Sequence, residues 1–360
     1  YGDQFRGHFT SALTVDQDLG FITKGLSATG MATFYNRVYS AVYRSFTPFL
    51  YKLTDYSIDD AGNYSYVSES ANTGTTYLGT SRGKDGYREL AFQVKLDYNR
   101  TFNEKHDVGA TLVYHQKERM MHISDSEEYA VLPYRQQGLA GRVTYGFDKR
   151  YLFEANFGYN GSENFAPGHR FGFFPAASVG WVISNEPFFK NMTRTVDLLK
   201  LRASYGIVGN DNIGGTGDRF AYFTQFGSGN SYGFGPNGNL VYGIRETLLG
   251  SDKLTWEKSY KTNIGLEMML WGKLNLTLDY YWERRKDILI QRSSLPSMAG
   301  FDASIYANMG EMDNKGVDAN LEYQTRIGNK VGLRLFGNLT YSKNKIVFRD
   351  EPAMQYAYQK

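Results

Sequence analysis

Alternation of apolar and polar residues at a period of two is the feature that most constrains this chain. From Lys273 to Arg285 the sequence reads KLNLTLDYYWERR. Successive side chains of a β-strand point to opposite faces, so this segment predicts a strand with one apolar and one polar face. The apolar face would cover a protein core in a soluble sandwich and contact lipid in a membrane barrel. The alternating apolar positions are Leu274, Leu276, Leu278, Tyr280 and Trp282.

Twelve segments are expected to form strands, most of them with such an alternating face. Several exceed ten residues, whereas strands of ordinary sheets average about 5–6 residues and membrane strands need about 9–11. Strand length therefore favours a membrane barrel. The expected strands span 5–16, 25–37, 87–100, 107–119, 138–147, 151–161, 173–184, 199–209, 255–270, 273–290, 305–326 and 331–347.

The connections between these strands alternate in length. Short connections such as 101–106 and 148–150 alternate with longer ones, of which 38–86 and 210–254 are the longest. In an up-and-down barrel every second connection emerges on the same side. The alternation therefore predicts an all-β, antiparallel up-and-down transmembrane β-barrel with short periplasmic turns and long extracellular loops.

Aromatic residues make up 16% of the chain, with 29 Tyr, 24 Phe and 4 Trp. Rings mark the strand ends at Tyr280-Tyr281-Trp282, at Tyr151 with Phe153, and at Trp181. Amphipathic rings favour the boundaries of a bilayer, so these residues predict aromatic girdles. The net charge of +3 is too balanced to indicate nucleic-acid binding. No apolar run reaches the roughly 20 residues that a membrane helix needs.

No motif of a known catalytic site is present. The chain lacks GxSxG, HExxH and Walker sequences, and its five histidines do not pair at metal-ligand spacing. Cysteine is absent, which excludes disulfides and thiol chemistry within this chain. We therefore expect a protein that is not an enzyme and that holds neither a metal nor a cofactor.

The polar faces of the expected strands carry charged and amide side chains. These would be solvated in a sandwich and would line the lumen in a barrel, and the loop alternation favours the lumen. The expected lumen-facing residues are Arg142, Glu154, Asn156, Lys200, Arg202, Glu267, Asp279, Asp318 and Asn320, and the expected lipid-facing residues are Leu274, Leu276, Leu278, Tyr280 and Trp282.

Two long loops are the expected cargo-binding segments. Residues 55–81 are rich in Tyr, Ser, Thr, Asn and Gly, and residues 210–244 are rich in Gly, Asn and aromatic residues. Loops of this length are usually functional or disordered, and their rings favour function. The candidate residues are Tyr64, Tyr66, Tyr77, Arg219, Tyr222, Phe226 and Tyr232.

The chain resembles the SusC/RagA-like TonB-dependent transporters of the bacterial outer membrane. The resemblance is carried by segments in collinear order rather than by any one of them. They are GSENFAPGHRFGFFPAASVGWVISNEPFF (161–189), LKLRASYGIVGND (199–211), LTWEKSYKTNIGLEMML (254–270), LDYYWERRKDILI (278–290), LPSMAGF (295–301), NMGEMDNKGVDANLEY (308–323) and TYSKNKIV (340–347).

The resemblance implies a 22-stranded barrel with a plug inside its lumen, which imports oligosaccharides or peptides by TonB-dependent active transport. It implies a SusD-like lipoprotein as a lid, TonB acting through the plug, outer-membrane lipid around the barrel, and pairs of transporters with paired lids. About 12 strands fall short of 22, and the chain has no plug segment. Residues 1–360 are therefore expected to be part of a single barrel domain whose plug and remaining strands lie outside this chain.

Two other functions stay open at the level of sequence. A passive outer-membrane channel would have similar architecture without a plug or TonB contact. A surface β-rich glycan-binding or adhesion protein would form a sandwich that needs no detergent. The composition of the long loops suits sugars and peptides equally, so the cargo is not assigned.

Overall fold

The computed structural model describes residues 2–121, 132–192, 194–213, 219–236, 238–294, 298, 300, 303–328 and 330–351. In this part of the chain it contains sixteen strands and two short 3-10 helices. The strands are β1 (Gly2–Asp18), β2 (Leu26–Ser45), β3 (Leu50–Ile58), β4 (Tyr64–Asn72), β5 (Gly79–Phe102), β6 (His106–Met121), β7 (Tyr134–Phe147), β8 (Tyr151–Ser162), β9 (Phe171–Val182), β10 (Val196–Asn210), β11 (Gln225–Phe234), β12 (Asn239–Leu249), β13 (Glu257–Leu270), β14 (Leu274–Gln291), β15 (Ser304–Ile327) and β16 (Val331–Phe348), and the helices are η1 (Ile183–Asn185) and η2 (Pro187–Met192).

The chain divides into two compact units, which are described separately. The smaller unit consists of Tyr1–Ala12, Thr33–Leu90 and Arg119–Pro133, and the larger unit of Leu13–Ala32, Ala91–Glu118 and Tyr134–Lys360. The smaller unit holds the β3–β4 hairpin, which forms a sheet of its own. Within this unit Arg119 contacts the carboxylate of Glu89 at 2.9 Å and lies over the ring of Tyr87.

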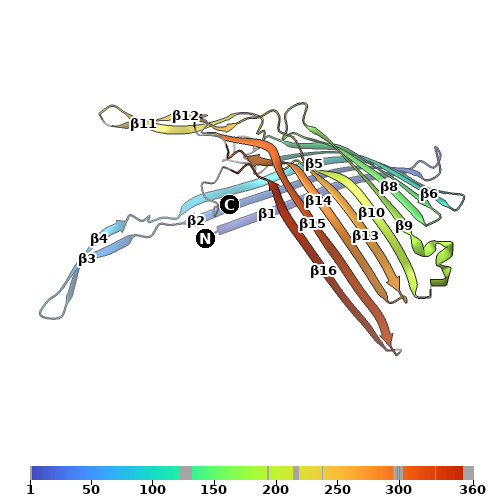
Figure 1. Cartoon of the computed structure of the whole chain (residues 1–360). Helices are drawn as coiled ribbons and strands as arrows, with labels where there is room; N and C mark the ends of the chain where they lie inside the picture. Colours follow the sequence, from blue (N-terminus) through green and yellow to red (C-terminus); the bar gives the residue numbers. More distant parts are fainter. Residues whose placement is uncertain are drawn as a thin grey trace. The chain divides into compact units, whose positions relative to one another are not determined.

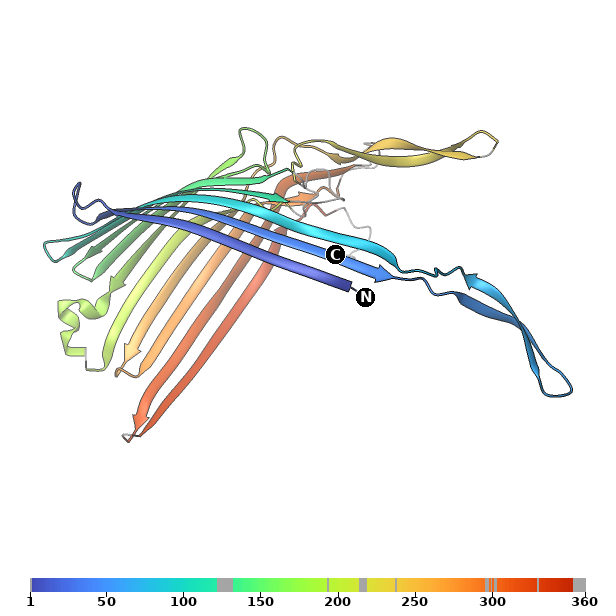
Figure 2. The same cartoon turned by 180° about the vertical axis from the view of Figure 1, so that it is seen from behind.

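Strands of the larger unit follow one another in chain order. Its portions of β1, β2, β5 and β6 are followed by β7 to β10, β13, β14 and β15, and β16 pairs with β15. The pairings from β7 to β10 and from β10 through β13 and β14 to β15 and β16 are antiparallel, and the strands lie side by side in a curved layer (Figure 1). The reverse view shows the same order (Figure 2). The twelve expected strands and their up-and-down arrangement are therefore confirmed.

Tight turns join the strands at one end of the sheet. At Asn103-Glu104, Asp148-Lys149 and Trp271-Gly272 both central residues have φ between 50° and 59°. Two successive residues with positive φ form the type I′ turn, whose twist matches that of the paired strands. Each of these turns reverses the chain with two residues, which accounts for the short connections at this end.

The two longest expected loops contain strands that the sequence analysis did not predict. Residues 38–86 include β3 and β4, and residues 210–254 include β11 and β12. Each pair is an antiparallel hairpin. β12 is attached to the main sheet by a short parallel pairing of Leu248 with Ser304 and Leu249 with Ile305.

The registers give the sheet of the larger unit two chemically different faces. Residues directly opposite in neighbouring strands share a face. We call one the apolar face, and two of its rows run across the strands. They are Tyr145, Phe153, Val179, Ala203, Ile264, Tyr280, Val317 and Tyr341, and Phe147, Tyr151, Trp181, Leu201, Leu266, Leu278, Ala319 and Leu339.

The opposite, polar face carries small and hydrophilic side chains at the same levels. One row places Thr144, Glu154, Ser178, Ser204 and Asn263 next to one another. Alternation along one strand thus assigns both faces, as the sequence pattern predicted. No helix among the described residues is long and apolar enough to cross a membrane.

Candidate functional site

Charged side chains on the polar face pair across neighbouring strands. Arg142 on β7 donates from Nη2 to Oε2 of Glu154 on β8 at 2.6 Å, and the amide of Asn156 donates to Oε1 of the same carboxylate at 2.8 Å. Arg142 lies opposite Asn156 in the register. Three of the expected lumen-facing residues are thus brought together in one hydrogen-bonded group.

A second group joins β10, β13 and β14. Glu267 on β13 lies opposite Lys200 and also contacts Arg202, at 3.4 and 3.2 Å. Arg202 also reaches Asp279 on β14, with Nη2 2.7 Å from Oδ2. The remaining two expected residues extend this face onto β15, where Asp318 lies opposite Asp279 and Asn320 opposite Thr277.

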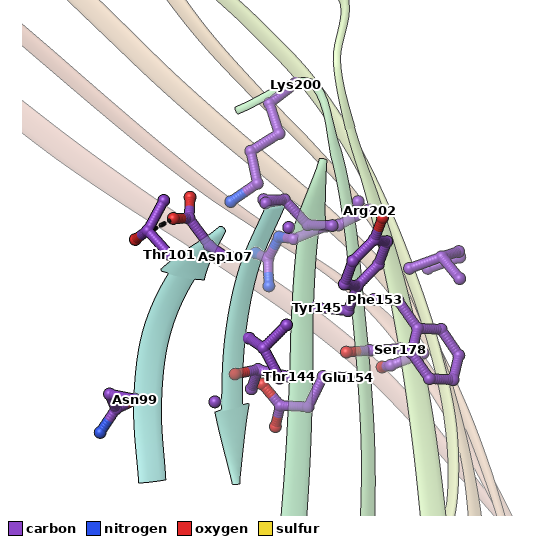
Figure 3. A pocket seen from close by; sticks show the side chains of 18 of the residues that line it. Asn99, Thr101, Asp107, Thr144, Tyr145, Phe153, Glu154, Ser178, Lys200 and Arg202 are labelled. Carbon is purple, nitrogen blue, oxygen red and sulfur yellow. Dashed lines mark hydrogen bonds between the residues drawn. The ribbon is translucent and has the colours of Figure 1, made fainter. Parts of the chain in front are cut away.

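A hollow of about 640 Å³ opens among the strands from β5 to β13 (Figure 3). Its lining includes small residues such as Gly109, Gly146, Ser178 and Gly180, which keep the side-chain layer thin. Charged groups of both signs also line it. They are Arg100, Asp107, Glu154, Lys200 and Arg202. The hollow can therefore hold a polar segment close to the strand backbones.

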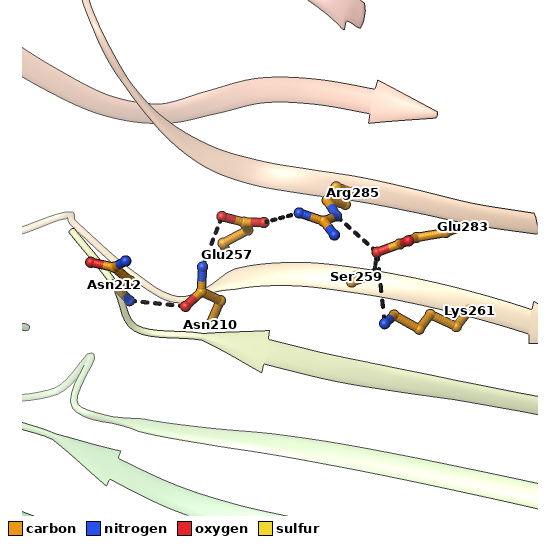
Figure 4. Close-up of polar contacts among 7 residues, drawn as sticks. All are labelled: Asn210, Asn212, Glu257, Ser259, Lys261, Glu283 and Arg285. Carbon is orange, nitrogen blue, oxygen red and sulfur yellow. Dashed lines mark hydrogen bonds and ion pairs between the residues drawn. The ribbon is translucent and has the colours of Figure 1, made fainter. Parts of the chain in front are cut away.

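A chain of polar contacts lies nearer the long-loop end of the same face (Figure 4). Asn210 at the end of β10 donates to Glu257 at 3.3 Å, and Glu257 lies 3.8 Å from Arg285. Arg285 in turn donates from Nε to Glu283 at 2.8 Å. Ser259 donates to the same oxygen of Glu283 at 2.5 Å, so the buried carboxylate has several donors. These contacts tie the start of the 211–224 connection to β13 and β14.

A small hydrophobic cluster lies beyond these contacts at the long-loop end. The indole of Trp256 packs against the rings of Phe165 and Phe174, with centroids 5.5 and 5.2 Å apart. Its Nε1 donates to the backbone oxygen of Arg170 at 3.1 Å. Among the described residues this cluster consists of Phe165, Phe174, Ile213, Ala221, Leu248, Leu254 and Trp256.

Asn308 fixes the strand ends beside this cluster. Its Nδ2 donates to the backbone oxygens of Thr255 and Asp287, both at 2.8 Å, and its Oδ1 accepts from the Thr255 amide at 2.9 Å. Asp287 has a φ of 57° and lies where the register between β14 and β15 shifts. Asn308 therefore holds an irregular strand segment in one conformation.

Arg219, one of the expected cargo residues, lies inside the packing. Its side chain is only 3% exposed, and its guanidinium lies 3.5 Å from the centroid of the Tyr134 ring. Phe220 lies on it as well, and Glu163 is 3.9 Å away. In this conformation Arg219 holds the loop packing together and cannot contact a ligand from solvent.

The rings of the β11–β12 hairpin are exposed, in contrast to Arg219. Phe226 and Tyr232 on β11 lie in solvent, and Tyr232 stacks edge-on against Phe234 with centroids 4.9 Å apart. Tyr222 precedes the hairpin and is half-buried against Phe223. This hairpin offers an aromatic surface of the larger unit.

The β3–β4 hairpin of the smaller unit has one aromatic face. Tyr56 lies opposite Tyr66, and Ile58 lies opposite Tyr64, so all four side chains share a face and all are exposed. The opposite face is polar, with Ser57 and Ser65 hydrogen-bonded at 2.6 Å. Tyr77 is exposed too, but it follows the hairpin rather than lying on it.

Sequence reasoning missed Tyr56 and Ile58, although the hairpin could have been found. YSI and YSY flank a DDAGN turn between residues 56 and 66. In that turn Asp59 accepts hydrogen bonds from the side chain and amide of Asn63 and from the amide of Ala61. The Asn63 side chain, followed by these amides, lowers the pKa of Asp59, so its carboxylate stays charged and holds the turn.

The expected lipid-facing residues all lie on the apolar face. Leu274, Leu276 and Leu278 face the corresponding apolar positions of β13 and β15, and Tyr280 and Trp282 continue the stripe. Tyr281, expected as part of the girdle, belongs to the polar face. A Cβ on Gly316 would lie 2.5 Å from its hydroxyl oxygen, so the Tyr281 side chain reaches over β15.

The described residues contain no group of three or more His, Asp or Glu side chains placed to hold a metal ion. The chemistry offered by the polar face and the hairpins is hydrogen bonding, ion pairing and contact with rings. These are the interactions by which proteins bind sugars and peptides.

Known proteins similar to this chain share its fold and parts of its sequence. A protein of Bacteroides thetaiotaomicron described as TonB-dependent receptor SusC is 32% identical over 207 residues, which are 57% of this chain and 20% of that protein. TonB-dependent receptor P39 of Formosa agariphila is 27% identical over 276 residues, which are 70% of this chain and 25% of that protein. The present chain thus spans only a fraction of the length of these relatives.

A solved structure of the RagAB peptide transporter has the same fold as this chain. It matches 95% of this chain and 37% of its own chain with a TM-score of 0.67, at 20% sequence identity. The model of a family described as TonB dependent receptor-like, beta-barrel matches residues 2–357. With its alternating strands, tight turns at one end and long connections at the other, the chain belongs to the β-barrel family of TonB-dependent receptors of the bacterial outer membrane.

Proposed function

We propose that the full protein imports oligomeric nutrients, either oligosaccharides or peptides, across the outer membrane by TonB-dependent active transport. The single observation that carries this proposal is the two-faced sheet, whose apolar rows run without interruption from β7 to β16 while ion pairs cover the other face. A wall of this kind separates lipid from a hydrated passage. The apolar face then contacts lipid and the polar face lines the lumen.

The relatives support transport rather than catalysis as the role of this wall. One is described as TonB-dependent receptor SusC and another as the RagAB peptide transporter. By analogy, a SusD-like lipoprotein covers the extracellular mouth, and TonB acts from the periplasm through a plug. Paired transporters with paired lids are part of the same proposal. The hollow on the polar face, with its small residues and mixed charges, suits a plug segment or cargo in close contact with the wall.

Cargo binding is assigned to the exposed rings of the two hairpins. Tyr64 and Tyr66, joined by Tyr56, form one aromatic surface, and Phe226 with Tyr232 forms another. Flat rings with a polar edge bind sugars and peptide side chains with little loss of conformational entropy. Tyr77 and Tyr222 are secondary candidates. Arg219 is assigned to packing, because its side chain is buried.

The test is uptake of labelled oligosaccharides and peptides by cells that produce the full protein. We expect replacement of Tyr56, Tyr64 and Tyr66 by alanine to raise the half-saturating cargo concentration by about tenfold or more, since the loss of an anchor residue costs about 2 kcal/mol or more. The matched control replaces Ser57 and Ser65 by alanine on the opposite face of the hairpin, and should transport normally.

Energy dependence separates the alternatives. Uptake that persists in cells lacking TonB would identify a passive channel, and a protein that stays in the aqueous phase without detergent would be a surface binding protein. Equal uptake by the tyrosine and serine variants would move the cargo site away from the β3–β4 hairpin.

A further inference from the structure

Two pairs of lysines lie directly opposite each other on the apolar face. Lys258 on β13 pairs with Lys286 on β14, and Lys315 on β15 pairs with Lys343 on β16. Residues opposite in an antiparallel pair have Cβ atoms about 5 Å apart, and like charges at that distance destabilise the sheet. An anion between the two ammonium groups would remove this repulsion.

The lysine pairs begin where the apolar stretch ends. On β14 the apolar face runs from Leu274 to Trp282, which is a length of nine residues, and then continues with Arg284 and Lys286. A tilted strand crosses the hydrocarbon core with about 9–11 residues. On β16 the ring of this face that precedes the lysines is Tyr341, and Lys343 follows it. The cations therefore lie at the level of the lipid headgroups, at the long-loop end.

Acidic neighbours neutralise only part of this surface. The surface carries six cations and three acids. The cations are Lys258, Arg284, Lys286, Lys315, Lys343 and Lys345, and the acids are Asp287, Glu311 and Asp313. Glu311 and Asp313 both contact Arg284, at 2.8 and 3.7 Å, and Asp287 lies 3.5 Å from Lys258. Within the described residues Lys286, Lys315, Lys343 and Lys345 have no ion pair within 4 Å, so the surface keeps a net positive charge.

Among the described residues, the lysines of this surface without an ion pair lie on β14–β16, whereas Arg135 at the long-loop end of β7 is paired with Glu118 at 2.8 Å. At the long-loop end of β8 and β9 the apolar face carries Phe157, Tyr159, Phe171 and Phe173, which stack on one another instead of presenting charge. An unspecific attraction to anionic headgroups would not need such a local concentration. The contrast indicates a site on one sector of the barrel.

We propose that these lysines bind the phosphate groups of an anionic lipid in the outer leaflet. A phosphate monoester carries a charge of about −1.5 to −2 and three acceptor oxygens, which matches the gap between two opposed ammonium groups. Each lysine pair holds one phosphate group, and Trp282 and Tyr341 contact the lipid directly beneath it. The inference rests on the proposed lipid-facing orientation of the apolar face, and it is independent of the transported cargo.

The experiment uses the full protein in phosphatidylcholine nanodiscs that contain spin-labelled phosphatidic acid as a minor component. Electron paramagnetic resonance measures how strongly the protein retains this lipid relative to spin-labelled phosphatidylcholine. A lysine at a charged membrane surface contributes about fivefold to association. We therefore expect the double variant Lys315→Gln with Lys343→Gln to lower the preference for phosphatidic acid by between about fivefold and about 25-fold.

Two matched variants define the outcome. Replacement by glutamine of Lys261, on the polar face of β13, and of Lys253, in the connection before this strand, removes the same charge outside the apolar face and should leave the preference unchanged. Lys315→Arg with Lys343→Arg keeps the charge and should keep the preference, which separates lost binding from lost folding. Heat-modifiable migration on gels checks that every variant is folded.

An unchanged preference both after Lys315→Gln with Lys343→Gln and after Lys258→Gln with Lys286→Gln would overturn the proposal. Displacement of the labelled lipid by inorganic phosphate at the same concentration would also overturn it, because the site would then take free phosphate rather than a lipid. Failure of cargo uptake would leave this result untouched. If the apolar face did not contact lipid at all, the spectra would show no motionally restricted lipid.

Discussion

Arg202 on β10 reaches Asp279 on β14 across the strand that separates them, with Nη2 2.7 Å from Oδ2. The residue between them on β13 is Gly265, which lies opposite Arg202 on one side and opposite Asp279 on the other. An added Cβ there would lie 2.5 Å from Nε of Arg202 and 2.7 Å from Oδ1 of Asp279. The ion pair therefore exists because this position has no side chain.

Replacing Gly265 by alanine should separate Arg202 from Asp279. The partly buried carboxylate then loses a charged donor, which we expect to lower the free energy of unfolding by about 1–3 kcal/mol. Denaturant unfolding of the full protein in detergent measures the change. Gly337→Ala is the matched control, because nothing lies within 4 Å of the Cβ it would add. Equal stability of the two variants would show that the pair tolerates a methyl group.

Leu278 and Thr277 are adjacent in β14 and lie on opposite faces of the sheet. Leu278 is central in the apolar stretch from Leu274 to Trp282. If this face contacts lipid, Leu278→Arg should cost about 2–4 kcal/mol, which is typical of a cation near the middle of the bilayer. Thr277→Arg adds the same charge to the hydrated face and should cost much less. Folding into lipid vesicles, followed by heat-modifiable migration, compares them, and equal yields would contradict the assigned faces.

The strands of the main sheet were predictable because their sequence pattern is local. A strand such as β14 shows its two faces in ten consecutive residues, and a tight turn such as Trp271-Gly272 fits the gap between two patterns. The hairpins β3–β4 and β11–β12 escaped prediction for a physical reason. Neither hairpin needs a long apolar face for burial, and the alternation in β3–β4 is confined to the residues beside its turn, Tyr56–Ile58 and Tyr64–Tyr66, which is too short to stand out from a loop.

The composition of the polar face was predictable, but its contacts were not. The sequence placed Arg202 and Asp279 on the same kind of face, yet they are 77 residues apart and meet only through the register of three strands. For Arg219 the composition of the sequence was misleading. Its loop is rich in glycine and aromatic residues, which suggested an exposed binding surface, whereas Tyr134, from a distant strand, covers its guanidinium.

Trp256 should control the order of the connections at the long-loop end. Its indole is 6% exposed and packs against Phe165 and Phe174. Truncation of a buried aromatic residue costs about 3–5 kcal/mol. Because five of the seven residues of this cluster lie in connections and Leu248 lies in β12, we expect Trp256→Ala to increase hydrogen exchange in β11–β12 while β13–β15 stay protected. Trp271→Ala, in a turn where the side chain is 57% exposed, is the control. Unchanged exchange in the hairpin would contradict this role.

Asp350, just after β16, binds the first residues of the connection between β14 and β15. Ser294 donates its hydroxyl to Oδ1 at 2.7 Å, while Arg292 Nε and the Ser293 amide donate to Oδ2 at 2.9 and 3.1 Å. The side chain is only 8% exposed. The hydroxyl of Ser294 and, after it, the guanidinium of Arg292 and the backbone amides lower the pKa of Asp350 to about 2.

The sign of this shift fixes the pH dependence of the Asp350 contacts. A carboxyl group whose pKa in the folded state is lower than its ordinary value of about 3.9 stabilises the structure above that value and loses this contribution as the pH falls towards 2. A spin label at Met298→Cys can report the change, because Met298 is 95% exposed and the chain has no cysteine of its own. We expect its mobility to stay constant from neutral pH to about 3 and to rise with a midpoint near 2. Asp350→Asn should mobilise the label at every pH, whereas a midpoint near 4 would mean that these donors do not stabilise the carboxylate.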